Sequence, residues 1–356
     1  MKHFDFVVIG GGIAGLLSAY RLKEFNTLLI DKEDIISKAS GAAGAFLFPK
    51  VGFDTAYTRF INDAILKSID FYKKLGINTH TKGVLILPRD KRDIEKFKKY
   101  EKEIRLPFKK MDGGFFFDMG SVVDPAEVRE KIRVNFKKLE ARKITQKENY
   151  WVINDEIKTK NIILATGAGE VINIPYIKIR AVWGERIEIK SDLKLLFYYH
   201  KNCSLGKIGK VVKIGATHKR ECFDCTENEK EALELIQKAK EITDIKEYEI
   251  LDIKGGFRAA SIDYFPVVGK IIDIDKTFLE NRHIVKGDMP KKIFYKEGLY
   301  IINGMGGRGF SNAVVCSEML YEYIINNKDL GEIDTKRLFI KWARKFGEKY
   351  LKEHLC

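Results

Sequence analysis

The chain of 356 residues is poor in cysteine and proline, with five of the former and seven of the latter. Five cysteines cannot all pair within one chain, which argues against a small secreted fold held together by disulfides. No apolar run approaches the roughly 20 residues that a membrane-spanning helix needs. The apolar residues near the N-terminus have the pattern of a strand rather than of a signal peptide. We therefore expect a cytoplasmic protein with no membrane partner.

Two of the cysteines, Cys222 and Cys225, form a CxxC motif that lies four residues after His218. A zinc site would need a second pair of ligands, and a redox motif would need a thioredoxin-like unit around it. Neither is evident in the sequence. We therefore interpret the two cysteines as separate thiols in a loop, leave their role open, and predict no metal site.

Acidic residues are outnumbered by basic ones, 50 to 64, which gives a formal net charge of +14. Much of the excess lies in two blocks: residues 82–110 contain eleven basic and five acidic residues, and residues 336–356 contain seven and two. A small anionic metabolite does not require such an excess, whereas the phosphates of a nucleic acid suit it. A lysine-rich composition of the whole chain is the alternative explanation.

The chain is well supplied with apolar residues (45%) and charged residues (32%), so it can bury a large core and is not disordered. Its length allows two domains. Apolar spacing predicts an amphipathic helix over residues 228–241. Residues 273–296 are interpreted as a long, charged surface loop.

A glycine loop follows the first apolar run. Residues 6–9 are apolar and β-branched, Gly10-x-Gly12-x-x-Gly15 follows, then residues with helical spacing, then a second apolar run that ends on Asp31. In this strand–turn–helix–strand unit the backbone approaches a pyrophosphate at the helix N-terminus, and the carboxylate binds a ribose hydroxyl. The unit predicts a bound dinucleotide, whose contacts we assign to Gly10, Gly12, Ile13, Ala14, Gly15, Asp31 and Lys32.

Small residues recur at two further places where a backbone can approach a flat ligand closely. One is the run of small residues that follows Asp31. The other is the carboxyl end of the buried strand 161–164, where ligands bind in doubly wound folds. Together with one residue of a predicted hairpin, they give the further predicted cofactor contacts Ser40, Gly41, Ala42, Gly44, Ala45, Ile144, Ala165, Thr166 and Gly167.

A second glycine loop, residues 304–309, again lies between an apolar strand (298–303) and a helical pattern. The partial positive charge of a helix N-terminus suits an anionic group, such as the reduced form of a flavin. Two such loops far apart in sequence indicate a ligand held at both ends, and FAD fits. A turn in which glycine serves packing alone is the alternative. The predicted contacts here are Gly304, Met305, Gly306, Gly307, Arg308, Gly309 and Phe310.

These segments resemble a known family. The chain is similar, over nearly its whole length, to amine-oxidising FAD proteins of the D-amino-acid oxidase and glycine oxidase type. Within that group it most resembles the FAD-dependent half of the MnmC family, which modifies the wobble uridine of tRNA. The segments that carry the resemblance are residues 39–49, 213–220, 256–269, 304–310, 315–318 and 337–345.

The resemblance implies an α/β fold: a Rossmann-like FAD-binding domain with an inserted, mostly antiparallel β-sheet substrate domain. No low-complexity linker separates the two, so we expect them to be interleaved. The run 41–44 departs from the family, which usually has polar residues there. The FAD-binding domain is expected over residues 1–78, 119–178 and 254–356, the substrate domain over 79–118 and 179–253, and a basic C-terminal tail helix over 336–356.

The resemblance also implies a reaction on the CH–NH group of the donor, with non-covalent FAD as the cofactor. The carboxymethyl group of 5-carboxymethylaminomethyl-uridine in the anticodon region of tRNA would be removed by oxidation, giving 5-aminomethyl-uridine and glyoxylate. The methyltransferase domain of the fused family members is not expected in this chain, so a separate methyltransferase is a candidate partner. The alternatives are a free amino-acid or sarcosine-type amine oxidase, and a tRNA-binding or flavin-carrying partner without turnover.

Such a reaction needs a cation that holds the substrate carboxylate, and arginine does this best because it binds bidentately. Arg258 follows a glycine pair at the expected domain junction, and Arg308 lies within the second glycine loop; the resemblance places both near the substrate. Tyr198 is a third catalytic candidate, which would close the pocket from the inserted sheet. The alternative for Arg258 is a surface salt bridge, and for Arg308 a contact within the loop. The alternative for Tyr198 is an aromatic side chain in the core. His200 and His218 are interpreted as structural histidines.

Overall fold

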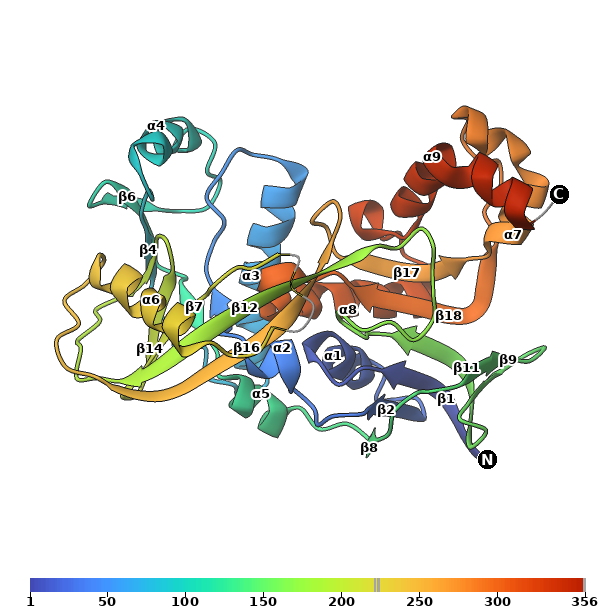
Figure 1. The fold of residues 1–356 in the computed structure, drawn as a ribbon, viewed down its shortest axis with the longest axis horizontal. Helices are drawn as coiled ribbons and strands as arrows, with labels where there is room; N and C mark the ends of the chain where they lie inside the picture. The colour runs from blue at the N-terminus through green and yellow to red at the C-terminus, as the bar shows by residue number, and fades with distance from the viewer. Residues whose placement is uncertain (221, 223–224, 355–356) are drawn as a thin grey trace.

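The computed structural model describes residues 1–220, 222 and 225–354, and two eight-stranded sheets dominate this part of the chain (Figure 1). The first sheet is mainly parallel, and β10 and β9 extend it as a hairpin beside β11. Its central strands are apolar and buried on both faces, as expected of a sheet that helices cover on both sides. In spatial order the main path is β17 (Val267–Ile272), β18 (Tyr295–Asn303), β11 (Ile157–Leu164), β1 (Lys2–Ile9), β2 (Thr27–Asp31) and β8 (Phe136–Lys138), with β10 (Trp151–Ile153) and β9 (Ile144–Gln146) at its side.

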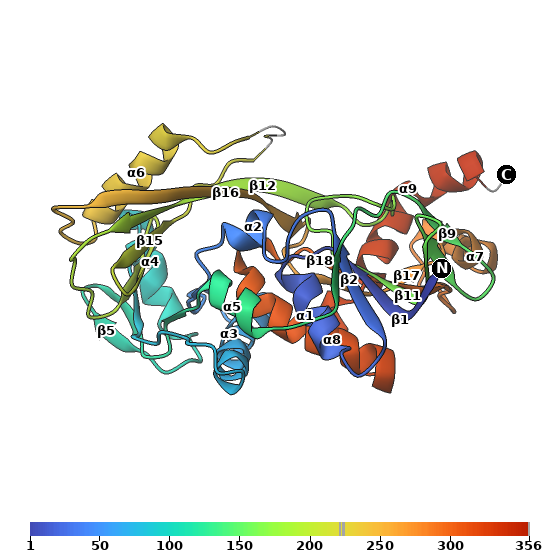
Figure 2. The ribbon, with the colours of Figure 1, turned by 90° about the horizontal axis from the view of Figure 1, so that it is seen from below.

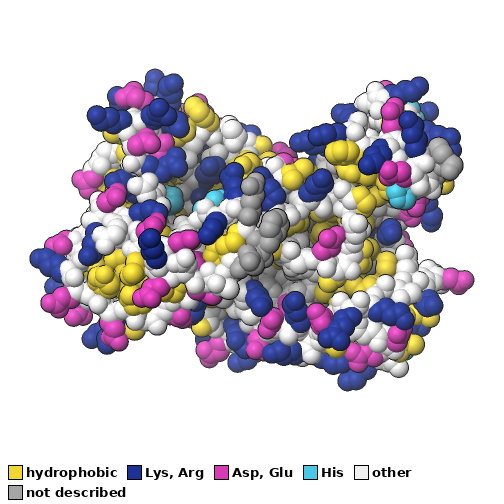
Figure 3. Space-filling view, in the orientation of Figure 1, with side chains coloured by type: hydrophobic (Ala, Val, Ile, Leu, Met, Phe, Trp, Pro, Cys, Tyr) yellow, Lys and Arg dark blue, Asp and Glu magenta, His cyan; other side chains and the backbone are white. Residues whose placement is uncertain are grey.

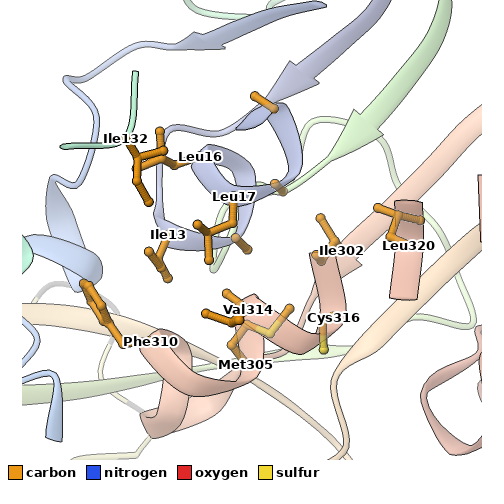
Figure 4. Packing of buried hydrophobic residues seen from close by; sticks show 14 of the residues in the cluster. Ile13, Leu16, Leu17, Ile132, Ile302, Met305, Phe310, Val314, Cys316 and Leu320 are labelled. Atoms are coloured by element: carbon orange, nitrogen blue, oxygen red, sulfur yellow. The ribbon is translucent and has the colours of Figure 1, made fainter. Parts of the chain in front are cut away.

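Helices pack on the two faces of this sheet. On one face lie α1 (Ile13–Arg21), α3 (Ala56–Lys74) and α8 (Gly309–Asn326), whose apolar side chains form one cluster with those of the sheet. Figure 4 shows Leu17 of α1 facing Val314 of α8 within this cluster. A second cluster on the other face contains α7 (Ile274–Glu280), η1 (Arg282–Lys286) and α9 (Lys336–His354).

The second sheet is antiparallel except for the parallel pair β13–β4. Helix α6 (Glu229–Lys240) covers one of its faces through an apolar cluster, and α4 (Lys91–Tyr100) packs at its far end, where Phe97 stacks on Phe115 at 5.1 Å. In order its strands are β16 (Glu249–Ser261), β12 (Ile179–Lys190), β15 (Val211–Gly215), β14 (Ser204–Ile208), β13 (Tyr198–His200), β4 (Val84–Ile86), β6 (Gly114–Phe117) and β5 (Lys109–Met111).

The two sheets meet through short elements and through the longest strands. Figure 2 shows β12 and β16 running from the region of α6 across α2, toward the first sheet. At the contact, a Cβ atom on Gly256 of β16 would lie 2.6 Å from the Cα atom of Ala39 in α2, so the strand passes directly over this helix. The short elements are α2 (Lys38–Gly41), β3 (Phe46–Leu47), β7 (Ser121–Val122), α5 (Pro125–Lys131), η2 (Gly306–Arg308) and η3 (Gly331–Ile333).

The predicted fold class is confirmed: a Rossmann-like parallel sheet carries a second, mostly antiparallel sheet. The amphipathic helix expected over 228–241 is also confirmed as α6. The domain limits stay a prediction; β16 runs through the expected limit at residue 254 without a break. Within the part of the chain that the structure describes, no helix combines the length and the apolar character needed to cross a membrane.

The interpretation of residues 273–296 as a surface loop is wrong. They contain α7 and η1, and Phe278 and Ile284 are fully buried there. Most residues of this segment are charged or polar, so its few apolar residues do not give a clear helical pattern in the sequence. The apolar positions pack against α9, where the rings of Phe278 and Phe339 lie 6.0 Å apart.

Candidate functional site

A cavity of about 1020 Å³ opens where the carboxyl ends of the parallel strands meet the second sheet. Both predicted glycine loops line it, together with the run of small residues and the strands β12 and β16. The sequence elements that were assigned to the two ends of one ligand therefore share a single cavity.

The first glycine loop has no room for a side chain at Gly10 or Gly15. Gly10 has a φ of +118°, and a Cβ atom on it would lie 2.3 Å from the carbonyl oxygen of Ala165. A Cβ atom on Gly15 would lie 1.8 Å from the carbonyl oxygen of Gly10. The amide of Ile13, at the start of α1, donates to the hydroxyl of Ser40 at 3.0 Å. The helix N-terminus is thus held against the run of small residues.

Asp31 lies at the end of β2, next to the first glycine loop. Its carboxylate accepts hydrogen bonds from the amide of Gly11 and from the amide of Glu33, the latter at 2.8 Å. Each carboxylate oxygen thus has one backbone donor and keeps further acceptor capacity. The structure therefore fixes the predicted ribose-binding group against the loop.

The second glycine loop is tied to the carboxyl end of β11. Asn303 donates from its amide nitrogen to the carbonyl oxygen of Gly167 at 2.9 Å, and its amide oxygen accepts from the amide of Gly304 at 2.8 Å. Asn312 donates to the carbonyl oxygen of Met305 at 3.2 Å. These side chains fix the loop that leads into α8.

The N-terminal ends of α1 and α8 lie side by side. A Cβ atom on Gly309 would be 3.3 Å from the side chain of Ile13, and both residues line the cavity. Two helix N-termini with their partial positive charges therefore face one space, which suits a ligand with separate anionic groups.

Arg258 and Arg308 also line this cavity. Arg258 donates to the carbonyl oxygen of Thr217 at 3.2 Å, and Arg308 donates to the carbonyl oxygen of Phe48 at 2.7 Å. Among the described residues neither has a carboxylate within 4.0 Å. Burial lowers the pKa of both guanidinium groups. A bound anion would offset the cost of burying their charge.

The position of Arg258 relative to the second glycine loop follows from two glycines. A Cβ atom on Gly184 would lie 1.9 Å from a terminal nitrogen of Arg258, and one on Gly307 would lie 3.9 Å from its Cδ atom. The arginine side chain therefore occupies the space that Gly184 leaves open and extends beside the loop that contains Arg308. A carboxylate bound there would lie close to the predicted flavin end of the cavity.

The other titratable groups near the arginines reinforce the positive potential or are neutral. Burial, followed by the charge of Arg308, lowers the pKa of Lys50. Burial, and then mainly Arg308, lowers the pKa of His200 to about 4, so this ring is neutral at pH 7 and shares a hydrogen bond with Ser204. In the described lining the acidic side chain is Glu185, which accepts from the amide of Asn228 at 2.7 Å.

The structure does not bring every predicted site residue to the cavity. Tyr198 is fully buried in the second sheet, where its hydroxyl donates to the carbonyl oxygen of His80 at 2.5 Å and its ring lies 5.9 Å from that of Phe48. Ile144 lies in β9 at the side of the first sheet, paired with Ile153. The cavity lining also leaves out Gly10, Gly15, Asp31, Lys32, Gly41, Thr166 and Gly304, and includes the remaining predicted residues.

Several residues in the lining were missed by sequence reasoning, chiefly Tyr57, Arg180 and Tyr264. Tyr57 and Arg180 lie in segments without a motif, and their sequence positions do not show which face of the chain they occupy. Tyr264 had one signal, its position within the family-like segment 256–269, two residues before Pro266.

The interpretation of Cys222 and Cys225 as separate thiols is wrong, because the structure joins them in a disulfide. Cys222 lines the cavity together with His218 and Arg220. Cys203 and Cys316 are free and buried. The two paired cysteines are three positions apart in sequence, and their Cα atoms lie 5.8 Å apart.

Comparisons with known proteins agree with this geometry. The family model described as FAD dependent oxidoreductase matches residues 5–323. The chain is 24% identical to the tRNA 5-methylaminomethyl-2-thiouridine biosynthesis bifunctional protein MnmC of Legionella pneumophila (strain Corby), over 93% of this chain and 55% of that protein. The chain thus spans about half the length of the curated relatives that it matches.

Solved structures share the fold. Glycine oxidase from Geobacillus kaustophilus superposes with a TM-score of 0.78 at 16% identity, covering 95% of this chain and 99% of that one. L-proline dehydrogenase from P. horikoshii gives a TM-score of 0.72 at 18% identity, covering 95% and 98%. At these identities the likeness concerns the fold alone.

The lowered pKa of His200 predicts how stability depends on pH. A histidine with a pKa of about 4 when folded, and about 6.5 when unfolded, binds fewer protons in the folded state. Its contribution to stability is complete above pH 6.5 and is lost as the pH falls toward 4. In His200→Asn the decline in unfolding free energy between pH 7 and pH 4 should shrink by up to about 3 kcal/mol.

Urea unfolding at a series of pH values measures this effect. His3→Asn, which replaces an exposed histidine on β1, is the matched control. An equal change in both variants would contradict the assignment of the pH dependence to His200.

Proposed function

The chain belongs to the family of FAD-dependent oxidoreductases, and we propose that it removes the carboxymethyl group of 5-carboxymethylaminomethyl-uridine at the wobble position of tRNA. The observation that carries the proposal is the pair Arg258 and Arg308, which line one cavity without a carboxylate partner among the described residues. The substrate group is an N-substituted glycine, so its own carboxylate would supply the missing anion.

The residues of the cavity fit FAD. The first glycine loop, which is closed to any Cβ atom at Gly10 and Gly15, would hold the pyrophosphate, and Asp31 would bind the ribose. The second glycine loop, at the N-terminus of α8, would hold the flavin ring. When bound there, FAD supplies an acceptor for two electrons and a proton, and we expect it to be held without a covalent bond.

The arginines position the substrate. With its carboxylate on Arg258 and Arg308, the carbon between amine and carboxylate would lie beside the second glycine loop. The amine must be unprotonated before this carbon can give up a hydride. The positive charges of Arg258, Arg308 and Lys50 would lower the pKa of that amine and favour its neutral form.

The reaction balances with one water molecule. The C–H bond next to the carboxylate would break with loss of a hydride, for which bound FAD would be the acceptor, and the neutral amine would become an imine that carries a proton on its nitrogen. Water adds to the imine carbon, the C–N bond breaks, and glyoxylate leaves. The nitrogen keeps its one hydrogen and takes a second from the water, whose other hydrogen leaves as a proton, so that 5-aminomethyl-uridine is released as a primary amine. His200 would be neutral, so the positive charge that binds the carboxylate would come from the arginines.

The basic surface supports a tRNA substrate. In Figure 3 Lys and Arg side chains gather over α4 and over α9, with a hollowed surface between the two. Around α4, several of the basic side chains already form ion pairs with acidic ones, as Arg89 does with Asp93. On α9, among the described residues, no carboxylate lies within 4.0 Å of Lys341, Arg344 or Lys345. These three are available to RNA phosphates. A separate methyltransferase stays a candidate partner.

Anaerobic bleaching of the flavin tests the proposal. We expect tRNA that carries 5-carboxymethylaminomethyl-uridine to bleach it, and glycine or sarcosine to leave it oxidised. Bleaching by the free amines alone would contradict the proposal and favour an amine oxidase. The absence of bleaching by any of them would favour a protein that binds tRNA or flavin without turnover.

Replacing Arg258 should separate substrate binding from cofactor binding. In Arg258→Met we expect full flavin content and a fall of kcat/KM by about 100-fold, because hydrogen bonds to charged groups are each worth about 1.5–3 kcal/mol. Flavin absorbance and stopped-flow bleaching measure the two quantities. Arg129→Met, on the exposed surface of α5, is the matched control. A wild-type rate in Arg258→Met would exclude this arginine as the carboxylate-binding group.

Phosphate contacts on α9 should appear in the salt dependence of RNA binding. For Lys341→Gln/Lys345→Gln we expect the slope of log K against log salt to become shallower by about one to two, since each lost phosphate contact removes roughly 0.7–0.9. Lys131→Gln/Arg133→Gln, which removes two exposed charges at the end of α5, is the control. An equal slope of log K against log salt in the two double variants would contradict binding of RNA phosphates on α9.

A further inference from the structure

An exposed aromatic ring lies at the cavity and has no part in the chemistry described so far. Tyr264 lines the cavity with Arg258 and Arg308, yet 55% of its surface is exposed. Its φ is +70°, a conformation that bulky side chains rarely adopt. Such a conformation persists where the surrounding structure enforces it, and it occurs preferentially at functional sites.

The backbone on both sides of Tyr264 is fixed by α9. The guanidinium of Arg337 makes a bidentate ion pair with Asp263, at 2.8 and 3.0 Å. It also donates to the carbonyl oxygens of Phe265 and Pro266, at 3.0 and 2.9 Å. One arginine therefore binds the residue before Tyr264 and the two residues after it. The turn presents the ring in a fixed position.

Other aromatic and cationic groups surround the ring. The guanidinium of Arg180 lies over it, 5.3 Å from its centroid, and is oriented by a hydrogen bond to the carbonyl oxygen of Ser261 at 2.8 Å. The ring of Tyr57, which also lines the cavity, is 6.3 Å away. An exposed ring beside an exposed arginine is a combination that binds unpaired bases of RNA.

We propose that Tyr264 is a stacking platform for the uracil base of the substrate nucleotide. This inference rests on the proposed function, since it places the base at Tyr264 while Arg258 and Arg308 hold the carboxylate deeper in the cavity. The aminomethyl linkage of the substrate then spans the space between the two points. Arg180, which is exposed beside the ring, is positioned for a phosphate next to this nucleotide. A free amino acid would use the arginines alone.

The test uses the full chain with bound FAD and a fluorescent anticodon stem-loop RNA, whose binding is followed by anisotropy. Tyr264→Gly removes the ring and suits the φ of +70°, because glycine adopts this conformation without strain. We expect it to weaken binding by about tenfold, whereas Tyr264→Phe keeps the ring and should change binding by less than about twofold. Leu196→Gly, which removes a side chain that is 84% exposed and outside the cavity, is the control.

A second RNA makes the test specific to the base. An abasic nucleotide at the wobble position should weaken binding to the wild-type protein by about tenfold, and should cause no further loss in Tyr264→Gly. Unchanged binding by Tyr264→Gly, or an equal abasic loss in both proteins, would overturn the role of Tyr264 and leave the proposed function intact. Failure of the wild-type protein to bind the RNA would instead overturn the proposed function and this inference with it.

Discussion

The close approach of two chain segments at the start of α1 is the constraint on which the site depends. Gly10 and Gly15 lie so close to neighbouring backbone atoms that a side chain at either position would push those atoms away. Gly309 allows the start of α8 to pack against Ile13. Because both helices begin at this junction, their N-termini open into one cavity. The shape of this end of the cavity is thus set by backbone packing.

The part of the cavity that contains Arg258 and Arg308 follows a different physical rule. Arg258 and Arg308 are held by carbonyl oxygens and have no carboxylate partner among the described residues, so their charges are exposed to whatever enters. A buried positive charge without a partner is unfavourable, and a bound anion relieves that cost. The chain belongs to an FAD-dependent family, and under the proposed function the arginines would select the carboxylate of the substrate.

Sequence reasoning succeeded where a residue type has a single physical use. The two glycine loops could be recognised because Gly10 and Gly304 need a backbone conformation that glycine adopts without strain. Arg258 and Arg308 also lie at the cavity, and their role in binding a carboxylate stays a prediction. It failed where the partner decides the outcome. Tyr198 is buried in the core of the second sheet. The helix that contains Phe278 packs its apolar side chains against α9, far along the chain. The position of Tyr264 depends on Arg337, some seventy residues later.

The length of β16 has a consequence for how this protein can change during evolution. One unbroken strand contains Gly256, which packs on α2, and Arg258, which faces the cavity, and it ends three residues before Tyr264. Side chains alternate between the faces of a strand, so a one-residue shift of the segment that contains Gly256 and Arg258 would turn both to the other face. A bulge can absorb an extra residue, as β16 already shows at Leu251, where its pairing with β12 shifts by one residue. Replacement of single side chains along β16 can therefore change what the cavity accepts without moving the other groups, whereas a change in its length needs a bulge that restores the faces of Gly256 and Arg258.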